Sequence, residues 1–341
     1  MRAFIGLSIL CLPLLAGPAS RQSGNEVAGS IQDGEVYRVS VRLVLVDAQV
    51  IDKKTHQMVS SLKKEDLEIY EDGVQQQIST FSQDELPLSV VLLFDLTDSV
   101  RPVLKPLAAG ALTALEHFKP EDEVAVMAYA ASARVIQDFT TDRALAAAAI
   151  EKASRMESGE AAFFNEAIYE ASSKLSRGAN PKSRRVIVWL TDDVPNIPSE
   201  DVTARYGRSL AAPPHTEKEA LNELFRSGTS VCTLLKRSEI SEWEDSRRDS
   251  TKIIGTMMYP PGDVYKYAQA SGGLVVESSA KKLPTRLAQL IDDLRLRYSL
   301  GYHPSAMRPQ GKFCAIKVKL APQIKKAQKN LVVEARQGYY R

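Results

Sequence analysis

The sequence predicts a mixed α/β fold, in which a parallel-dominated sheet with helices on both faces is inserted in a small β-sandwich. Between residues 87 and 294, short apolar runs alternate with helical stretches, which is typical of parallel strands joined by helices. Residues 36–86 and 295–341 show β patterns instead. Because unpaired strand edges are unfavourable, we expect these two flanks to pair into one sandwich around the inserted domain.

The first flank is expected to form a long strand and a hairpin. Residues Tyr37–Ile51 mix apolar and polar side chains at nearly period two, which is typical of a half-buried strand. Leu62–Tyr70 is expected to be a second strand, and Asp72-Gly73 turns the chain into a third over Val74–Phe81. Three further strands are expected in the second flank, at Leu296–Tyr302, Lys312–Leu320 and Leu331–Arg336.

The central region is expected to begin at Pro87 and to supply the parallel sheet with its helices. Its strands are expected at Val90–Phe94, Glu123–Tyr129, Arg134–Phe139 (a short edge strand), Arg185–Leu190, Ser230–Leu235 and Leu274–Glu277. Its helices are expected at Pro102–Phe118, Asp142–Lys152, Asn165–Leu175, Glu217–Arg226, Asp263–Ala270 and Leu283–Leu294. Two polar stretches, Val194–His215 and Lys236–Pro261, are expected to be long loops.

The first residues indicate export. Met1-Arg2 is positive, Ala3–Ala16 is almost wholly apolar, and small residues follow up to Ser20, which is the pattern of a secretory signal peptide over residues 1–20. An uncleaved anchor is the alternative. Residues 21–35 are polar and are expected to be a flexible leader. No other segment is apolar enough to span a membrane, so we expect a periplasmic, cell-envelope or extracellular protein.

Cysteine usage does not indicate a disulfide framework. After the signal peptide only Cys232 and Cys314 remain, and they lie far apart in the sequence. We expect buried free thiols, while a single bridge between them stays an alternative in an oxidising compartment.

Charge and common catalytic motifs exclude several classes. Lys+Arg total 44 and Asp+Glu total 42, a balance that gives no support for binding nucleic acid or an anionic membrane. No Gly-x-Ser-x-Gly or His-Glu-x-x-His pattern occurs. The histidines show no spacing typical of metal ligands, and surface or turn positions are expected for all four: His56, His117, His215 and His303.

Hard oxygen ligands follow two of the apolar strands. Asp95, Thr97 and Ser99 come directly after the first strand of the central region, and Asp192 follows the strand Arg185–Leu190. The carboxyl ends of strands in an open parallel sheet form the usual ligand-binding edge, so these side chains are expected to meet there. Carboxylate and hydroxyl oxygens suit Mg²⁺. The prediction is a magnesium site in which Asp192 supports the other three residues.

These residues carry a resemblance to a known family. The string Asp95-x-Thr97-x-Ser99, the stretch Glu121–Tyr129, Asp138-Phe139-Thr140 and Leu190-Thr191-Asp192 resemble, in order and spacing, the von Willebrand factor type A (vWA) family over Leu88–Asp293. The resemblance implies a Rossmann-like domain with a metal-ion-dependent adhesion site (MIDAS). It also implies a protein partner whose Asp or Glu carboxylate completes the coordination of the ion.

The flanks resemble a narrower bacterial group, the acidobacterial VWFA-related proteins. The residues that carry this resemblance are Asp66–Gly73 in the first flank, and Tyr298–Tyr302 and Arg336–Tyr340 in the second.

The chain departs from the family at one position of the metal site. Members with a working site add a threonine from a loop that precedes a helix, and here Ala161 or Ala162 stands in its place. Glu160 is a nearby carboxylate that would make the ion less electrophilic. The alternative is a degenerate site without metal, in which Asp95 caps the following helix and Thr97 bonds locally.

The sequence therefore predicts an exported, non-enzymatic protein that binds another protein at the metal-site face, framed by residues 159–164 and 194–215. A metal-independent structural protein of the cell envelope is the first alternative. The second is a phosphohydrolase of the haloacid dehalogenase type, with Asp95 as nucleophile and Asp192-Asp193 holding Mg²⁺. That class needs an Asp at the position of Thr97.

Overall fold

The computed structural model describes residues 43–55, 57–83, 86–157, 162–192, 215–236, 264–304 and 309–341. All of them belong to one compact unit that spans residues 41–341. The predicted signal peptide and leader lie outside the described residues, as do nearly all of the two predicted long loops. Within the described ranges, no helix has both the length and the apolar character that a membrane span requires.

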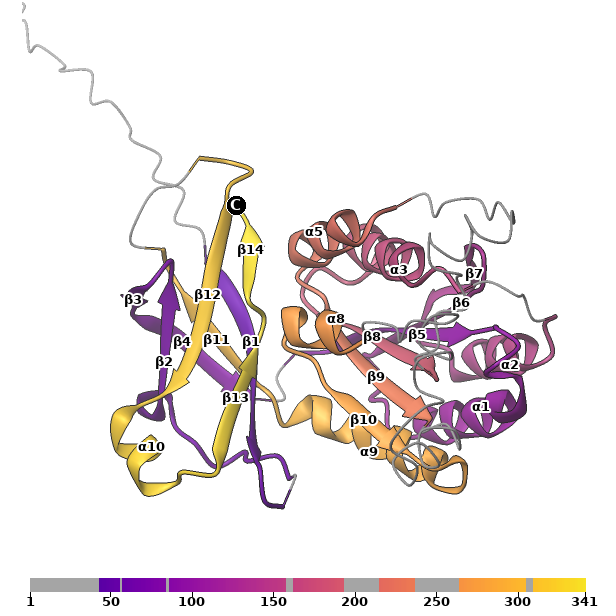
Figure 1. The fold of residues 1–341 in the computed structure, drawn as a ribbon, viewed down its shortest axis with the longest axis horizontal. Helices are drawn as coiled ribbons and strands as arrows, with labels where there is room; N and C mark the ends of the chain where they lie inside the picture. The colour runs from indigo at the N-terminus through magenta and orange to yellow at the C-terminus, as the bar shows by residue number, and fades with distance from the viewer. Residues whose placement is uncertain are drawn as a thin grey trace, which may run out of the picture. The chain divides into compact units, whose positions relative to one another are not determined.

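The central region forms a six-stranded sheet in the order β10-β9-β8-β5-β6-β7 (Figure 1). All neighbouring strands are parallel except the edge strand β7, which runs antiparallel to β6. The strands are β5 (Leu88–Asp95), β6 (Glu123–Tyr129), β7 (Ala133–Thr140), β8 (Arg184–Thr191), β9 (Ser230–Lys236) and β10 (Val275–Ser278). Every residue of β5 is buried, as expected for a strand covered on both faces.

Helices cover both faces of this sheet (Figure 1). Val90, Leu92 and Phe94 of β5 pack in one core with α1 (Arg101–Leu115), α2 (Arg143–Ser154) and α9 (Leu283–Arg295). Val91 and Leu93 belong to the other core, with α3 (Phe164–Gly178), α5 (Glu217–Ser227) and α8 (Val264–Ser271). The alternation of side chains along β5 therefore supplies both cores, which confirms the predicted layered α/β arrangement.

The two flanks form a sandwich of two four-stranded sheets, ordered β13-β1-β11-β4 and β14-β12-β2-β3. The first flank contributes β1 (Val44–Asp52), β2 (Leu67–Glu71), β3 (Val74–Gln76) and β4 (Ile78–Gln83). The second contributes β11 (Tyr298–Tyr302), β12 (Phe313–Leu320), β13 (Leu331–Ala335) and β14 (Gly338–Tyr340). Alternate residues of β12 point into a shared core, which confirms that both flanks build one sandwich. The exact domain bounds given above stay a prediction.

Several predicted elements of the flanks differ from the structure. The strand predicted over Leu62–Tyr70 begins only at Leu67, because a short 3₁₀ helix, η1 (Lys64–Asp66), precedes it. The Asp66 carboxylate accepts a hydrogen bond from the Lys63 backbone N–H at 2.8 Å and closes that turn. The single strand predicted over Val74–Phe81 is divided between β3 and β4, which lie in different sheets.

A short helix that was not predicted, α10 (Pro322–Ala327), connects β12 and β13. A second 3₁₀ helix, η2 (Ala280–Lys282), leads into α9. Cys232 in β9 and Cys314 in β12 are buried and free, as expected.

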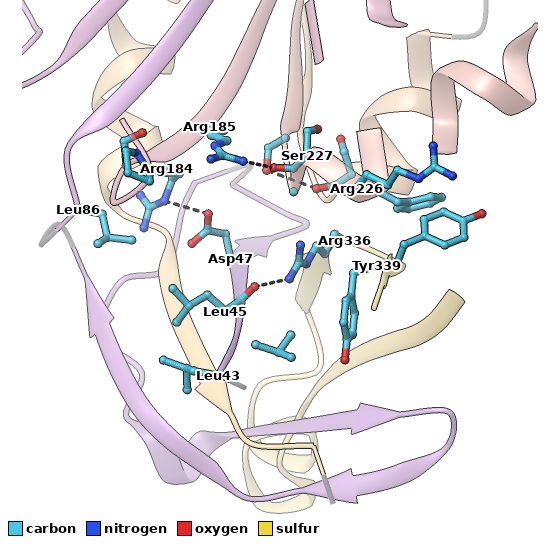
Figure 2. Close-up of a pocket in the computed structure, with 18 residues that line it drawn as sticks. Leu43, Leu45, Asp47, Leu86, Arg184, Arg185, Arg226, Ser227, Arg336 and Tyr339 are labelled. Atoms are coloured by element: carbon cyan, nitrogen blue, oxygen red, sulfur yellow. Dashed lines mark hydrogen bonds and ion pairs between the residues drawn. The ribbon is translucent and has the colours of Figure 1, made fainter. Parts of the chain in front are cut away.

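An ion pair joins the sandwich to the α/β sheet (Figure 2). The Arg184 guanidinium, at the start of β8, lies 3.2 Å from the Asp47 carboxylate of β1, and its side chain is only 1% exposed. Arg184 also donates to Ser299 Oγ at 3.0 Å, and Ser299 Oγ donates to Asp47 Oδ1 at 2.8 Å. Burial would raise the pKa of Asp47, but the positive charges of Arg184 and Arg297 hold it below its usual value.

A cavity of about 290 Å³ lies beside this ion pair, and four arginines line it. Each is already engaged by a neighbour. Arg185 donates to the Ser227 carbonyl at 2.9 Å, Arg336 donates to the Leu45 carbonyl, and Arg226 lies over the ring of Tyr340 (Figure 2). The contacts of these arginines therefore connect β1, β8, α5 and the C-terminal strands of the sandwich.

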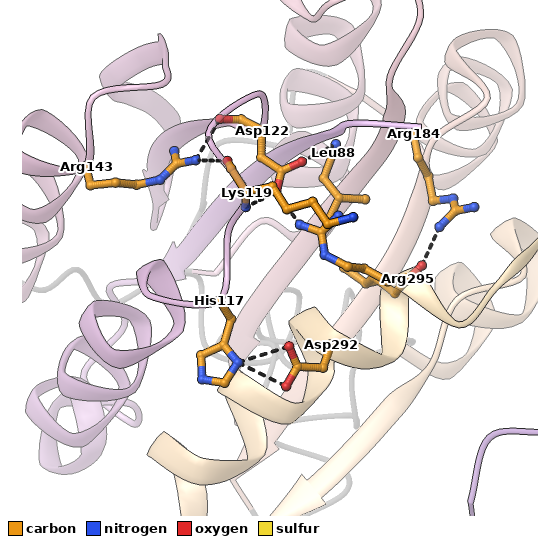
Figure 3. Close-up of polar contacts among 9 residues, drawn as sticks. Leu88, His117, Lys119, Asp122, Arg143, Arg184, Asp292 and Arg295 are labelled. Carbon is orange, nitrogen blue, oxygen red and sulfur yellow. Dashed lines mark hydrogen bonds and ion pairs between the residues drawn. The ribbon is translucent and has the colours of Figure 1, made fainter. Parts of the chain in front are cut away.

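A buried aspartate lies at the amino end of the sheet, the same end as Arg184 (Figure 3). The Asp122 side chain is fully buried and accepts backbone hydrogen bonds from Leu88 at 2.8 Å and Lys119 at 2.7 Å. It also pairs with the guanidinium of Arg295, at the end of α9. One carboxylate therefore ties together the start of β5, the turn before β6 and the last turn of α9.

Candidate functional site

The predicted site residues lie where the strand order of the sheet reverses. From β5 the chain continues to β6 on one side, and it later returns to β8 on the other side of β5. β5 and β8 are parallel neighbours with Phe94 opposite Leu190, so Asp95 and Asp192 follow at the same edge. This reversal is the usual ligand-binding position of an open α/β sheet. The structure therefore brings the two acids together, as the sequence analysis expected.

Asp95 is the centre of a hydrogen-bond network. Its Oδ1 accepts from the backbone N–H of Thr97 at 2.9 Å and from the Thr97 hydroxyl at 2.7 Å. Its Oδ2 accepts from the hydroxyls of Tyr129 at 2.8 Å and Thr191 at 2.7 Å. Asp95 and Thr97 have no exposed surface, whereas Asp192 is 8% exposed. The carboxylate is thus held in one orientation, with the more accessible acid beside it.

The sequence analysis did not identify Tyr129 and Thr191 as parts of this network. Tyr129 ends β6, the neighbour of β5, and its hydroxyl also accepts a hydrogen bond from the indole of Trp189 at 2.9 Å. Thr191 ends β8, immediately before Asp192. Both residues end strands that are adjacent to β5, and this position in the sequence could have predicted that they lie near Asp95.

Burial is the main influence on the ionisation of Asp95. The pKa of Asp95 is raised to about 6, and desolvation by burial is the largest cause. The hydrogen bonds from Thr97 and Thr191 lower this pKa, and the negative charge of Asp192 raises it. Burial and the neighbouring Asp95 also raise the pKa of Tyr129, so its hydroxyl stays a donor at neutral pH. A cation beside the two acids would favour the charged form of Asp95.

The spacing of the hydroxyls fits an octahedral cation. Thr97 Oγ1 and Ser99 Oγ are 3.1 Å apart. Adjacent ligands of Mg²⁺, each at about 2.1 Å from the ion, are separated by about 3 Å. Because the Thr97 hydroxyl donates a hydrogen bond to Asp95, its oxygen lone pairs remain able to face an ion. Asp95, Thr97, Ser99 and Asp192 are thus the residues of this chain that would hold Mg²⁺.

The position of the missing threonine is only partly described. Residues 158–161, which include Glu160 and Ala161, lie outside the described residues. Ala162 is fully buried in the core between the sheet and α3. A methyl group packed in that core offers no oxygen to an ion, so residue 162 does not replace the hydroxyl.

The ionisation of Asp95 predicts how stability depends on pH in the presence of chelator. Its pKa is about 6 in the folded state and about 3.9 in an unfolded chain. Folding therefore takes up protons between these values, and Asp95 makes the protein less stable as pH rises from 4 to 7, by about 3 kcal/mol. We expect urea denaturation to show Asp95→Asn gaining stability relative to the wild type over this range. A constant difference between the two proteins would contradict the raised pKa.

Comparison with known proteins agrees with this fold. Residues 90–194 match the sequence model of the von Willebrand factor type A domain family. The matched residues run from β5 to the end of β8, within the parallel-dominated sheet and its layers of helices. A search of curated proteins finds no significant match to the sequence.

Solved structures with a similar arrangement are distant in sequence. A von Willebrand factor type A protein from Catenulispora acidiphila is 11% identical, with a TM-score of 0.42 over 82% of this chain and 74% of that one. BatB from Bacteroides thetaiotaomicron is 15% identical, with a TM-score of 0.40 over 61% of this chain and 98% of that one. Proximal thread matrix protein 1 of the mussel byssus, with a zinc-occupied MIDAS motif, is 12% identical, with a TM-score of 0.40 over 61% of this chain and 48% of that one. Values this low carry no conclusion about function.

Proposed function

We propose that this protein binds a divalent cation, Mg²⁺ by preference, at Asp95, Thr97, Ser99 and Asp192, and through it a carboxylate of a protein partner. The observation that carries the proposal is the pair of hydroxyls 3.1 Å apart, beside two acids at the edge where the strand order reverses. Two neutral ligands leave the ion electrophilic, so that an Asp or Glu side chain of the partner completes its coordination.

The residues of this chain have distinct tasks in that mechanism. Thr97 and Ser99 present their oxygens to the ion. Asp95 orients Thr97 by accepting a hydrogen bond from its hydroxyl. Tyr129 and Thr191 fix the second oxygen of Asp95, so the carboxylate cannot rotate away. Asp192, which is slightly exposed, adds negative charge next to the ion. None of these steps breaks a covalent bond, so the proposal is for a binding protein and not an enzyme.

The same proposal includes export to the cell envelope or beyond, based on the signal-like first 20 residues, and a place in the acidobacterial VWFA-related group, based on the flank motifs. Mass spectrometry of the exported protein tests the first point, because a mature chain that begins near residue 21 is expected. Retention of the first 20 residues would favour the uncleaved anchor.

Replacing one hydroxyl tests the metal site. We expect Thr97→Val to weaken Mg²⁺ binding at least about tenfold, because the variant keeps the shape of the side chain but loses a ligand oxygen. The matched control is Thr113→Val, since Thr113 is exposed on α1 and, among the described residues, its hydroxyl bonds only the Ala109 carbonyl in its own helix. Calorimetric titration with MgCl₂ measures both variants. Equal affinities in the wild type and Thr97→Val would contradict the site.

A metal-independent scaffold is the second candidate, and one observation favours it. Both oxygens of Asp95 are already occupied by hydrogen bonds from this chain, so the network is complete without an ion. Pull-down from an envelope extract separates the two functions. The adhesion mechanism expects partners that are lost with chelator and with Thr97→Val, whereas the scaffold expects the same partners in every condition.

The phosphohydrolase alternative has little support. Asp95 has no exposed surface and accepts hydrogen bonds on both oxygens, which does not suit a nucleophile. We expect no Mg²⁺-dependent hydrolysis of a generic phosphate ester, and activity that disappears in Asp95→Asn would reverse this assignment.

A further inference from the structure

A second group of metal-ligating side chains lies between α3 and α5, and it shares no residue with the candidate adhesion site. Glu166 and Glu170 are one turn apart on α3, and His215 lies two residues before the start of α5, next to its N-cap Thr216. One ligand atom from each residue lies within 4.8 Å of the other two. The histidine is 45 residues beyond Glu170 in sequence, which is why spacing along the chain did not reveal the group.

The histidine of this group is held in a fixed orientation. Its Nδ1 lies 2.6 Å from Glu166 Oε2, and its ring stacks on Tyr169 with centroids 3.5 Å apart and an angle of 12° between the planes. Thr216, the next residue, caps α5 in a capping box with Glu219, so the backbone beside His215 is also fixed. Helical ligands and a stacked ring are the rigid supports that a metal site requires.

The charges of the group are not balanced by its own residues. Glu166 is only 8% exposed, and Glu170 is half-buried. Among the described residues, no hydrogen bond or ion pair neutralises Glu170, so two carboxylates face a single imidazole. Removing two neighbouring carboxylates from water is unfavourable unless a positive charge lies close to them. A bound divalent cation would supply that charge.

The types of donor atom indicate which cation this is. One imidazole nitrogen and two carboxylate oxygens suit a first-row transition metal, and above all Zn²⁺, whereas Mg²⁺ prefers oxygen ligands alone. Ligands of tetrahedral Zn²⁺ at about 2.0–2.1 Å lie about 3.3 Å apart. The Glu166–His215 contact would open slightly and Glu170 would move closer, changes that rotation of the glutamate side chains can provide.

From this geometry we infer that Glu166, Glu170 and His215 form a binding site for Zn²⁺ or a similar transition metal, with its remaining coordination position open to water. The site is separate from the proposed Mg²⁺ site in its residues and in its donor atoms. It joins α3 to α5, so an ion there would hold these two helices together.

Titration with Co²⁺, which reports its coordination through visible absorption, tests this inference on the full chain. Saturating Mg²⁺ is present throughout to occupy the adhesion site. We expect the wild type to bind Co²⁺, with Zn²⁺ displacing it, and we expect His215→Gln and Glu170→Gln each to weaken binding at least about tenfold. Zn²⁺ should raise the melting temperature of the wild type but not of either variant.

Two control variants make the test specific. His117 also faces a carboxylate, with its Nδ1 3.0 Å from Asp292, but no group of three ligands forms there in the described part of the chain. His117→Gln should therefore bind Co²⁺ as the wild type does. Asp95→Asn should also retain Co²⁺ binding, because it alters only the adhesion site. If His215→Gln or Glu170→Gln is folded by circular dichroism and still binds Co²⁺ as tightly as the wild type, the metal site is contradicted. The group would then be only a His–Glu pair. Loss of binding in Asp95→Asn would assign the ion to the other site.

Discussion

Asp122→Ala is expected to lower the free energy of unfolding by about 3–5 kcal/mol, one of the largest effects of any single substitution in this chain. The carboxylate is fully buried and serves three partners at once (Figure 3). Its removal leaves two backbone N–H groups without an acceptor, and it leaves the guanidinium of Arg295, whose side chain is 11% exposed, without its counter-charge. Chemical denaturation monitored by circular dichroism measures the loss.

The control for this substitution is Asp98→Ala. Asp98 pairs with Arg101 at 3.9 Å, but both side chains are more than 60% exposed, so the change should stay within about 0.5 kcal/mol. A loss for Asp122→Ala as small as that for Asp98→Ala would mean that water replaces all three contacts, and that the carboxylate does not tie the sheet to α9.

Asp47→Asn is expected to destabilise the protein by about 3–5 kcal/mol, because it leaves the buried Arg184 without a negative partner. In the double variant Asp47→Asn/Arg184→Met the buried charge of Arg184 is removed as well, while that of Arg297 remains, so part of this loss should be regained. Urea denaturation of the wild type, both single variants and the double variant gives the coupling energy. If the two substitutions change the free energy of unfolding additively, the ion pair does not stabilise the contact between β1 and β8.

The Asp47–Arg184 ion pair also predicts the direction in which the stability of the protein changes with pH. The pKa of Asp47 is below its usual value in the folded protein, so its contribution to stability is present above pH 4 and is lost as pH falls further. The stability difference between the wild type and Asp47→Asn should therefore shrink on acidification below pH 4. This trend is opposite to the one expected for Asp95, whose pKa is raised.

Strong periodicity explains which parts of the fold were predictable. The unbroken apolar run of β5 and the alternation along β12 each specify how many faces of the strand are buried, and both elements were found. The division of residues 74–83 between two sheets was not predictable, because the break at Gln77 changes the strand's partners without a break in its β pattern. Pairing is decided by distant strands, which local patterns do not report.

The candidate site was predictable for a different reason. Asp95 and Asp192 each follow an apolar strand, and parallel strands present their carboxyl ends at one edge, so their proximity follows from topology alone. Tyr129 and Thr191 reach Asp95 only through the directions of their side chains. His215 meets Glu166 because α3 and α5 lie side by side, and nothing in the local sequence of either helix records this contact.

The arrangement of β1 has a consequence for biosynthesis. This strand is among the first to leave the ribosome, yet its neighbours β11 and β13 are encoded about 250 and about 280 residues later. Until translation reaches them, a nascent strand with apolar side chains stays without partners and prone to aggregate. Cells that make this protein would therefore be expected to shield that segment with a chaperone for most of the time the polypeptide is being made.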